Sequence, residues 1–213
     1  MKNLKPIATK LLATLLLSAS AQSAQLTIAV DLSGSNPFLK DERASKGAAY
    51  YASQHVSQLS TGDSVVLQSF GSLQSFDNFE ALQVTLTRKN QKQLVKGIQS
   101  KLTTLASQAK EQGSTNLIAY FGRNDFGCEQ TGSTVLVLTD GIEASEYVDP
   151  NKLLAGEVSL PSPNTFAQDN LKGCTVIFYG LGIGRHDSEM VRLREAWSEY
   201  FKQTNSHFKA VIK

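Results

Sequence analysis

Short apolar runs alternate with longer amphipathic stretches along most of this chain. The runs are rich in β-branched residues and nearly continuous in hydrophobicity, which is typical of strands buried on both faces of a sheet. The strongest runs lie at residues 26–30, 64–70, 134–139 and 175–180, with weaker ones at 79–86 and 207–212. These segments are predicted to be the strands of the fold.

Between the runs, apolar residues recur at spacings of three and four, which predicts helices with one buried face. Such stripes cover residues 39–59, 90–110 and 190–200. Strands that alternate with helices favour parallel strands joined by right-handed crossovers, with helices on both faces of the sheet. Residues 25–213 are therefore predicted to form one doubly wound α/β domain. The run at 79–86 follows its neighbour after a short turn, so we expect an antiparallel edge strand there.

The first residues have the layout of a secretory signal peptide. Lys2, Lys5 and Lys10 precede the apolar run LLATLLL, and small residues follow it. This run is shorter than the roughly 20 apolar residues that a membrane-spanning helix needs, and no later segment is apolar enough to insert. We expect residues 1–21 to be removed by cleavage after Ala21, or after Ala24. The mature chain would then act in the periplasm of a bacterium or outside the cell.

Charge and cysteine content narrow the classes of function. The chain has 21 Lys and Arg against 19 Asp and Glu, and without the three leader lysines its formal charge falls from +2 to −1. A basic surface for nucleic acid is therefore not expected. The two cysteines, Cys128 and Cys174, are an even number in a chain predicted to be exported, which favours a disulfide over two independent thiols.

Two of the predicted strands end in an aspartate followed by turn-forming residues. Asp31 closes the first strand in the sequence AVDLSGS, and Asp140 closes a later one in VLTDG. In a doubly wound sheet, ligands bind beyond the carboxyl ends of the strands where the strand order reverses. If these two strands are neighbours there, their carboxylates meet, and a divalent cation would relieve the repulsion between them.

The residues around these aspartates are those that a hard cation prefers. Ser33 and Ser35 add hydroxyl oxygens, and Gly34 is expected to let the loop turn tightly enough to aim both inward. The segment GSTNLIAYF offers Thr115 at the start of a short helix. Oxygen-only ligation with retained waters favours Mg²⁺, with Mn²⁺ as a substitute, and this group of residues holds no Cys or His for zinc.

The motifs DLSGS, GST and TDG, in this order and on this alternation of elements, resemble a von Willebrand factor type A domain with a metal-ion-dependent adhesion site. The resemblance covers nearly the whole mature chain. It implies that Asp31, Ser33, Ser35, Thr115 and Asp140 form the site, with the serines binding the ion directly. It also implies that an acidic side chain of a partner protein completes the metal shell. One departure is Asn36-Pro37, where the family often has an apolar residue.

Two other functions compete with metal-dependent adhesion. The first is a metal-free scaffolding domain of the same fold that docks through its helices or through residues 142–172. The second is a metal-dependent hydrolase, because aspartate-nucleophile phosphotransferases also carry an aspartate at the end of a strand, as Asp31 is here. Those enzymes need an acid two residues later, where this chain has Ser33, and the chain contains no nucleophile elbow or Walker loop. The glycines of YGLGIGRHD lack dinucleotide-binding spacing and favour a strand-to-helix turn.

Two segments are candidates for contact with a partner. Residues 142–172 leave the sheet directly after Asp140 and carry Glu143, Glu146 and Asp149, which we expect to contribute to partner specificity. A crossover helix with ragged ends is the alternative for this segment. Along the middle helix, a series of lysines forms either a solvated face or a docking surface for acidic groups. Its members are Lys89, Lys92, Lys96, Lys101 and Lys110.

Overall fold

A computed structural model of the chain describes residues 23–72, 78–79 and 81–212. The predicted leader, residues 1–21, lies outside the described residues. Within the described part, six strands form one sheet in the order β3-β2-β1-β4-β5-β6. They are β1 (Gln25–Asp31), β2 (Ser64–Phe70), β3 (Leu82–Thr85), β4 (Thr134–Leu138), β5 (Thr175–Tyr179) and β6 (His207–Val211). All neighbours are parallel except β2 and β3.

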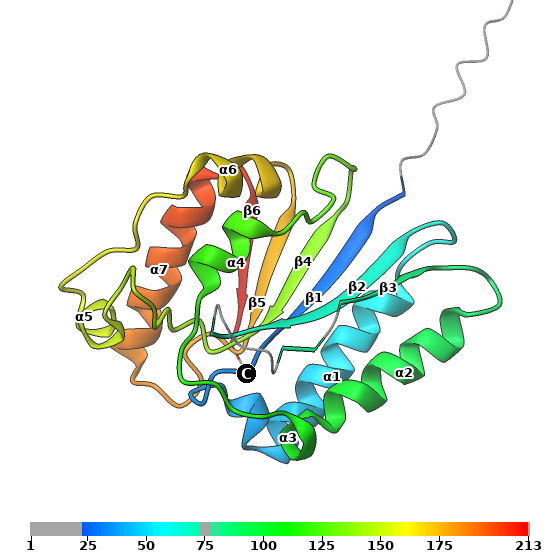
Figure 1. The fold of residues 1–213 in the computed structure, drawn as a ribbon, viewed down its shortest axis with the longest axis horizontal. Coiled ribbons are helices and arrows are strands. Elements are labelled where there is room, and N and C mark those ends of the chain that lie inside the picture. Colours follow the sequence, from blue (N-terminus) through cyan, green and yellow to red (C-terminus); the bar gives the residue numbers. More distant parts are fainter. Residues whose placement is uncertain (1–22, 73–77, 80, 213) are drawn as a thin grey trace, which may run out of the picture.

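This topology confirms the predicted doubly wound α/β fold and the antiparallel edge strand at β3. Eight helical segments within the described residues connect the strands. They are η1 (Pro37–Leu39), α1 (Glu42–Ser57), α2 (Gln91–Thr103), α3 (Leu105–Gln108), α4 (Leu117–Arg123), α5 (Pro150–Ala155), α6 (Thr165–Leu171) and α7 (Asp187–Gln203). Helices α1 and α2 cover one face of the sheet, and α4, α6 and α7 cover the other (Figure 1).

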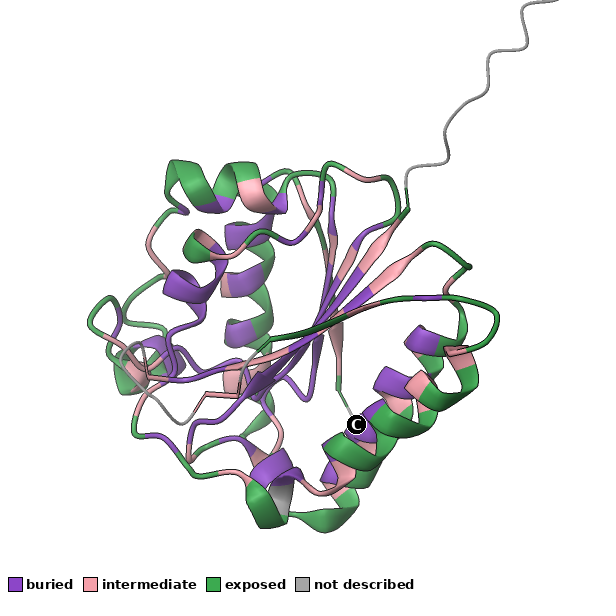
Figure 2. Cartoon of the chain, turned by 45° about the vertical axis from the view of Figure 1, so that its right-hand side comes forward, coloured by how far each residue is buried: buried purple, intermediate pink, exposed green. Residues whose placement is uncertain are grey.

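The central strands are hydrophobic without interruption because both of their faces are covered. In β4, Val135 and Val137 belong to the core on the α7 side, whereas Leu136 and Leu138 belong to the core on the α1 side. Both cores therefore draw alternate residues from the same strand, as the period of two requires. The central strands β1, β4 and β5 are buried along most of their length, whereas the edge strands β3 and β6 are half-buried or exposed (Figure 2). The long helices α1, α2 and α7 bury only their inner sides.

Local capping decides where the predicted helices begin and end. Helix α1 starts at Glu42 because the Asp41 carboxylate accepts hydrogen bonds from the backbone N–H groups of Arg43 (2.7 Å) and Ala44 (2.9 Å). The predicted helix at 90–110 divides into α2 and α3 at Thr104. The Thr103 and Thr104 hydroxyls donate to backbone carbonyls three or four residues earlier, a bonding pattern that bends helices.

The predicted disulfide is confirmed. Cys128, in the turn before β4, is bonded to Cys174, at the start of β5, and both are buried in the core on the α7 side. The bridge closes a loop that spans 46 positions in the sequence and contains β4, α5 and α6. It therefore joins two neighbouring strands at the end of the sheet opposite to Asp31.

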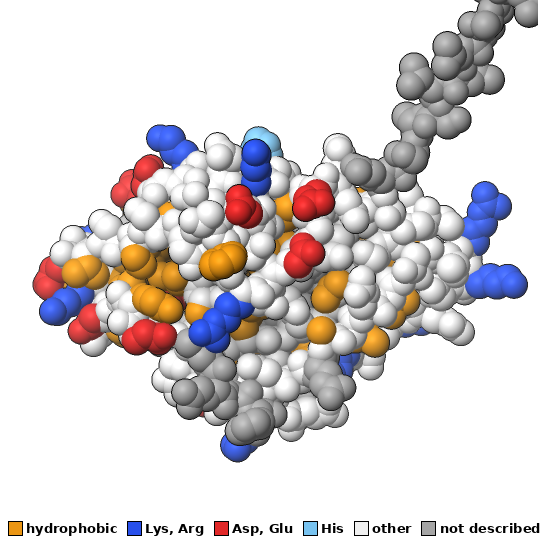
Figure 3. All heavy atoms as spheres, turned by 45° about the horizontal axis from the view of Figure 1, so that its top comes forward, with side chains coloured by type: hydrophobic (Ala, Val, Ile, Leu, Met, Phe, Trp, Pro, Cys, Tyr) orange, Lys and Arg blue, Asp and Glu red, His pale blue; other side chains and the backbone are white. Residues whose placement is uncertain are grey.

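One face of the domain carries charges of both signs together with several apolar side chains (Figure 3). On the face drawn in Figure 3, acidic and basic side chains are interspersed, so no continuous field of one sign covers it. Among the residues described, no helix combines the length and apolarity that crossing a membrane would require.

Candidate metal centre

The two aspartates lie where the direction of the strand order reverses. Strand β1 pairs in parallel with β2 on one side and with β4 on the other. Val30 is level with Leu138, so Asp31 and Asp140 leave the sheet together at its carboxyl edge. Both carboxylates are buried, with Asp31 0% and Asp140 2% exposed. The two strands are therefore neighbours at the reversal, as the sequence analysis requires for these distant carboxylates to meet, and the carboxylates interact electrostatically.

Asp31 is held in place through both of its carboxylate oxygens. Its Oδ1 accepts the backbone N–H of Ser33 at 2.8 Å, and its Oδ2 accepts the hydroxyl of Thr139 at 2.7 Å. The Thr139 hydroxyl in turn accepts the backbone N–H of Gly141 at 2.9 Å. Sequence reasoning missed Thr139, although its position directly before Asp140 at the end of β4 was a usable signal.

The two serines face each other across a tight turn. Ser33 Oγ and Ser35 Oγ lie 3.2 Å apart, and the Asn36 N–H donates to the Ser33 carbonyl at 3.0 Å. The expected role of Gly34 needs a correction. Gly34 does not have a positive φ, but a Cβ there would lie only 3.1 Å from Glu111 Oε2. That oxygen is the end of a flexible, half-exposed side chain, and the backbone of Gln112 lies 3.8 Å away, so this contact does not by itself require glycine.

Asn36 joins the two strand ends. Its Nδ2 donates to the Asp31 carbonyl at 2.5 Å and to the Leu138 carbonyl at 3.2 Å, and its Oδ1 accepts the Phe38 N–H. The side chain is completely buried. Asn36 thus satisfies carbonyls that the sheet leaves unpaired and fixes the separation of β1 and β4 below the two carboxylates.

Thr115 is fastened between the loops that carry the other candidate ligands. Three residues earlier, Gln112 donates its N–H to Leu32 and accepts the N–H of Gly34. Thr115 itself exchanges two backbone hydrogen bonds of 3.0 Å with Ala144, in the loop after Asp140. Its side chain is 1% exposed, and Thr115 Oγ1 has no hydrogen-bond partner. A buried hydroxyl without a partner is costly, so its position requires an explanation.

The carboxylates of Asp31 and Asp140 are buried close together without enough positive charge nearby to balance them. Burial and the nearby Asp140 carboxylate raise the pKa of Asp31 to about 7, against the opposing hydrogen bonds from Thr139 and Ser33. Burial also raises the pKa of Asp140, and the Ile142 N–H, the Ser35 hydroxyl and Arg185 oppose this rise. A divalent cation would supply the missing charge and keep both groups ionised.

The donor set fits a hard oxygen-seeking cation. Within the described ranges, no group of three or more His, Cys, Asp or Glu side chains is arranged to hold a metal. A metal at this crevice would therefore depend on the hydroxyls of Ser33, Ser35 and Thr115 together with Asp31 and Asp140. The orphaned Thr115 hydroxyl fits this role, and oxygen-only ligation favours Mg²⁺ or Mn²⁺ over zinc.

The three acidic residues proposed for partner specificity lie in different settings. Glu143 is buried, accepts the Ile118 N–H and the Ser145 hydroxyl, and has its pKa raised by burial to about 7. Glu146 is exposed. Asp149 is exposed too, but its Oδ1 accepts the first backbone N–H groups of α5. Glu146 is therefore the member of this set that is both accessible and outside any helix cap.

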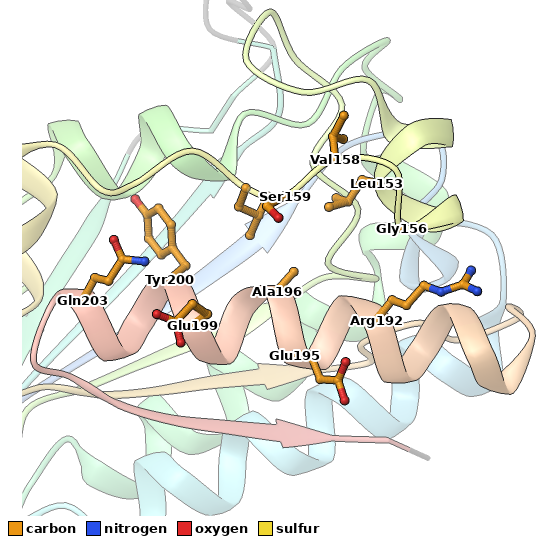
Figure 4. Close-up of a pocket in the computed structure, with 11 residues that line it drawn as sticks. Leu153, Gly156, Val158, Ser159, Arg192, Glu195, Ala196, Glu199, Tyr200 and Gln203 are labelled. Atoms are coloured by element: carbon orange, nitrogen blue, oxygen red, sulfur yellow. The ribbon is translucent and has the colours of Figure 1, made fainter.

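Residues 142–172 form two short helices, α5 and α6, with extended chain between them. A hollow of about 330 Å³ separates residues 156–160 from α7, with Tyr200 and Gln203 toward one end and Arg192 toward the other (Figure 4). Arg192 Nη1 donates to the Leu154 carbonyl at 2.8 Å, which fastens α5 to α7. None of the five candidate ligands lines this hollow, so it is separate from the candidate metal centre.

We expect Trp197→Phe to lower the free energy of unfolding by about 2 to 4 kcal/mol. The buried indole Nε1 of Trp197 donates to the Gly141 carbonyl at 2.7 Å, which ties α7 to the turn after Asp140. The substitution leaves a cavity and an unpaired carbonyl. Urea denaturation measures the change. Tyr200→Phe is the matched control, because it removes a buried hydroxyl that has no partner and should be neutral or stabilising. Equal losses in both variants would contradict the specific role of the indole hydrogen bond.

No family model and no curated protein matches the sequence of this chain. Solved structures similar to it include the pilus adhesin SpaC from Lactobacillus rhamnosus GG in an open conformation, at 14% identity and a TM-score of 0.49. That match covers 89% of this chain and 28% of the adhesin, so this chain spans little more than a quarter of the adhesin's length.

Two further similar structures come from other organisms. An aerotolerance-related membrane protein from Bacteroides fragilis is 20% identical, with 89% of this chain and 92% of that chain covered and a TM-score of 0.47. The manganese-loaded TRAP protein from Plasmodium vivax is 16% identical, with 86% and 72% covered and a TM-score of 0.42. These likenesses are too distant to transfer a ligand, a partner or an activity to this chain.

Proposed function

We propose that this chain is an exported type A domain that binds Mg²⁺, or Mn²⁺, and recognises a partner protein through the ion. Asp31, Ser33, Ser35, Thr115 and Asp140 would hold the metal. A carboxylate of the partner would complete the shell. Such a domain would serve as an interaction component of an envelope, adhesion, secretion or transfer assembly.

One observation carries the proposal. Thr115 Oγ1 is buried without a partner in a segment that is hydrogen-bonded to the loops of both aspartates. A hydroxyl placed there by chance would be expected to find a partner or to reach water. A cation between the two loops would take this oxygen as a ligand and would also neutralise the negative charges of Asp31 and Asp140.

The ligand set favours adhesion over hydrolysis. When bound, the ion supplies an electrophilic centre that attracts a carboxylate, because three of its five protein ligands are neutral hydroxyls. The position two residues after Asp31, where aspartate-nucleophile phosphotransferases need their acid, is occupied by Ser33. His55 packs against Tyr51 in α1, and His186 precedes α7, so neither lies on the loops of the site.

The disulfide supports action outside the cytoplasm. The Cys128–Cys174 bridge needs an oxidising compartment to persist, which agrees with the signal peptide expected at residues 1–21. The periplasm and the extracellular space both meet this condition. The exposed Glu146 would face a basic group of the partner beside the carboxylate that completes the metal shell.

The Thr115 hydroxyl provides the test. We expect Mg²⁺ to raise the unfolding temperature of the wild type and of Thr115→Ser, which keeps the hydroxyl, but not that of Thr115→Val, which replaces it with a methyl group. In EDTA, Thr115→Val should be as stable as the wild type or more stable, because it removes a buried polar atom without a partner. Differential scanning calorimetry with and without Mg²⁺ measures these effects.

Partner capture separates the proposal from its main alternative. Pull-downs from the native envelope in Mg²⁺ and in EDTA should differ for the wild type and should not differ for Thr115→Val. Capture that is equally strong in EDTA, together with no thermal response to Mg²⁺, would contradict metal-dependent adhesion and would favour a metal-free scaffolding domain. Turnover of a phosphate ester that Asp31→Asn abolishes would favour the hydrolase.

A further inference from the structure

An apolar groove lies at the edge of the sheet, between β3 and α2. It encloses about 470 Å³, and almost all of its lining is apolar. The main contributors are Leu67, Phe79, Leu82, Val84, Leu94 and Ile98. Leu82 is 52% exposed, although it sits on a strand of the sheet. Exposed apolar surface beside an edge strand is a liability unless something covers it.

A glycine in the middle of α2 keeps this groove open. Gly97 lines the groove, and a Cβ built on it would meet no atom within 4 Å. Gly in a helix interior costs about 1 kcal/mol relative to Ala, and nothing in the packing of the described residues or in a positive φ requires Gly97. The open space above Gly97 is thus available to a side chain from outside the domain.

In the segment that contains β3 and α2, which line the groove, every charged residue is basic. Residues 81–110 contain six Lys and Arg and no Asp or Glu, whereas the rest of the chain has 15 Lys and Arg against 19 Asp and Glu. Lys101 lies at the groove itself, with its Nζ 5.7 Å from the centre of the Phe79 ring. Among the described residues, no carboxylate forms an ion pair with Lys92, Lys96 or Lys101.

We propose that this groove docks an acidic segment of a partner protein that carries large apolar side chains. The apolar side chains would fill the space beside Leu82 and above Gly97, and an acidic group would pair with Lys101, the lysine that lines the groove. A concave apolar floor admits single side chains and is poorly shaped for a flat bilayer surface. A phosphate backbone would leave that floor uncovered. The contact uses none of the candidate metal ligands, so it is independent of Mg²⁺.

Two synthetic peptides of equal length test the docking. Both carry Leu at the same positions, and the remaining positions are Glu in one peptide and Lys in the other. In EDTA and low salt, we expect fluorescence anisotropy to show that the mature protein binds the Glu peptide about tenfold more tightly than the Lys peptide. In NMR spectra of the ¹⁵N-labelled protein, addition of the Glu peptide should shift the amide resonances of β3 and α2.

Three variants locate the contact. Lys101→Glu should weaken binding of the Glu peptide about tenfold, whereas Lys172→Glu, the same charge change beside α6 on the opposite face, should leave it unchanged. Gly97→Leu should also weaken binding while the unfolding temperature stays equal to or above that of the wild type, because the new side chain fills the groove without a clash. Reduced binding therefore cannot result from unfolding.

Several outcomes would overturn the proposal. Equal affinity for the two peptides, or no binding of either, would contradict the proposal that the groove binds an acidic segment. Binding to anionic vesicles or to an oligonucleotide that Gly97→Leu weakens more than it weakens peptide binding would assign the groove to a different ligand. A concentration-dependent dimer that Gly97→Leu abolishes would assign it to a second copy of this chain. Loss of peptide binding in EDTA alone would place the contact at the metal centre.

Discussion

In EDTA at about pH 8, Asp31→Asn is expected to be more stable than the wild type, by up to about 4 kcal/mol. Burial and the neighbouring Asp140 carboxylate raise the pKa of Asp31 from 3.8 to about 7, so ionisation of the folded protein is unfavourable there. Asn keeps an oxygen for the Ser33 N–H, is similar in size and carries no charge, but its amide NH₂ replaces the oxygen that accepts the Thr139 hydroxyl, which offsets part of the gain. The variant therefore avoids the cost of a buried carboxylate that has no cation beside it.

The pH dependence of this advantage has a definite sign. The folded protein holds the Asp31 proton more tightly than the unfolded chain does, so the wild type loses stability as the pH rises through the interval between about 4 and 7. Below this interval, Asp31 is protonated in both states and the variant should have no advantage. Urea denaturation in EDTA at a series of pH values measures the difference between the two proteins.

Mg²⁺ should narrow the stability advantage of Asp31→Asn. For a site with a Kd of about 0.1 to 1 mM, about 10 mM Mg²⁺ adds roughly 1.4 to 2.7 kcal/mol to the wild type. Asp31→Asn should gain little, because it lacks the second carboxylate. Asp169→Asn, at an exposed carboxylate on α6, is the control for the loss of one negative charge. If the wild type has the higher free energy of unfolding in EDTA at about pH 8, the Asp31 carboxylate is well solvated or paired, which would contradict this prediction.

The parts of this site that could be predicted from the sequence are those that depend on residue type at strand ends. Asp31 and Asp140 follow β-branched apolar runs, and parallel strands place their carboxyl ends at one edge. The pairing of β1 with β4 then brings the two together. Thr139 is a partial exception. Its place directly before Asp140 can be seen in the sequence, but its hydrogen bond to Asp31 depends on which side of β4 faces β1.

The rest depends on contacts between loops, and these carry no period in the sequence. Gln112 bonds to the turn of Ser33 through its backbone, so its side-chain type gave no signal. Asn36 read as a departure from the family pattern, and only the positions of the Asp31 and Leu138 carbonyls explain it. Glu143 looked like a surface acid because three polar or small residues follow it, yet it is buried and caps the start of α4.

Breaking the Cys128–Cys174 bridge is expected to have the other large effect, a loss of about 4 kcal/mol in the free energy of unfolding. The bridge spans 46 positions, so its removal restores considerable freedom to the unfolded chain. For a domain of this size, that loss corresponds to a fall of roughly 8 to 16 °C in the unfolding temperature. Cys128→Ala combined with Cys174→Ala removes the bridge and both thiols at once.

Calorimetry of four samples isolates this effect: wild type and double variant, each with and without dithiothreitol. The reductant should lower the unfolding temperature of the wild type to near that of the double variant and should leave the double variant unchanged. The fold should survive, since the register of β4 and β5 is set by core residues on both faces of the sheet. A wild type that is indifferent to reductant would contradict the stabilising role of the bridge.

The size of this effect links the disulfide to the compartment. A typical domain has only about 5 to 15 kcal/mol of stability, so a loss of about 4 kcal/mol leaves little margin in a reducing environment. The segment that the bridge closes also contains Asp140 and Glu143, between β4 and α5. Reduction should lower the stability of the fold but leave the Mg²⁺ response of the still folded protein unchanged, because the bridge lies at the opposite end of the sheet from Asp31 and stabilisation by a bound ion depends on its affinity for the folded state. A weakened Mg²⁺ response in the reduced, folded protein would show that the bridge helps Asn36, Thr139 and the Trp197–Gly141 hydrogen bond to hold the candidate metal centre.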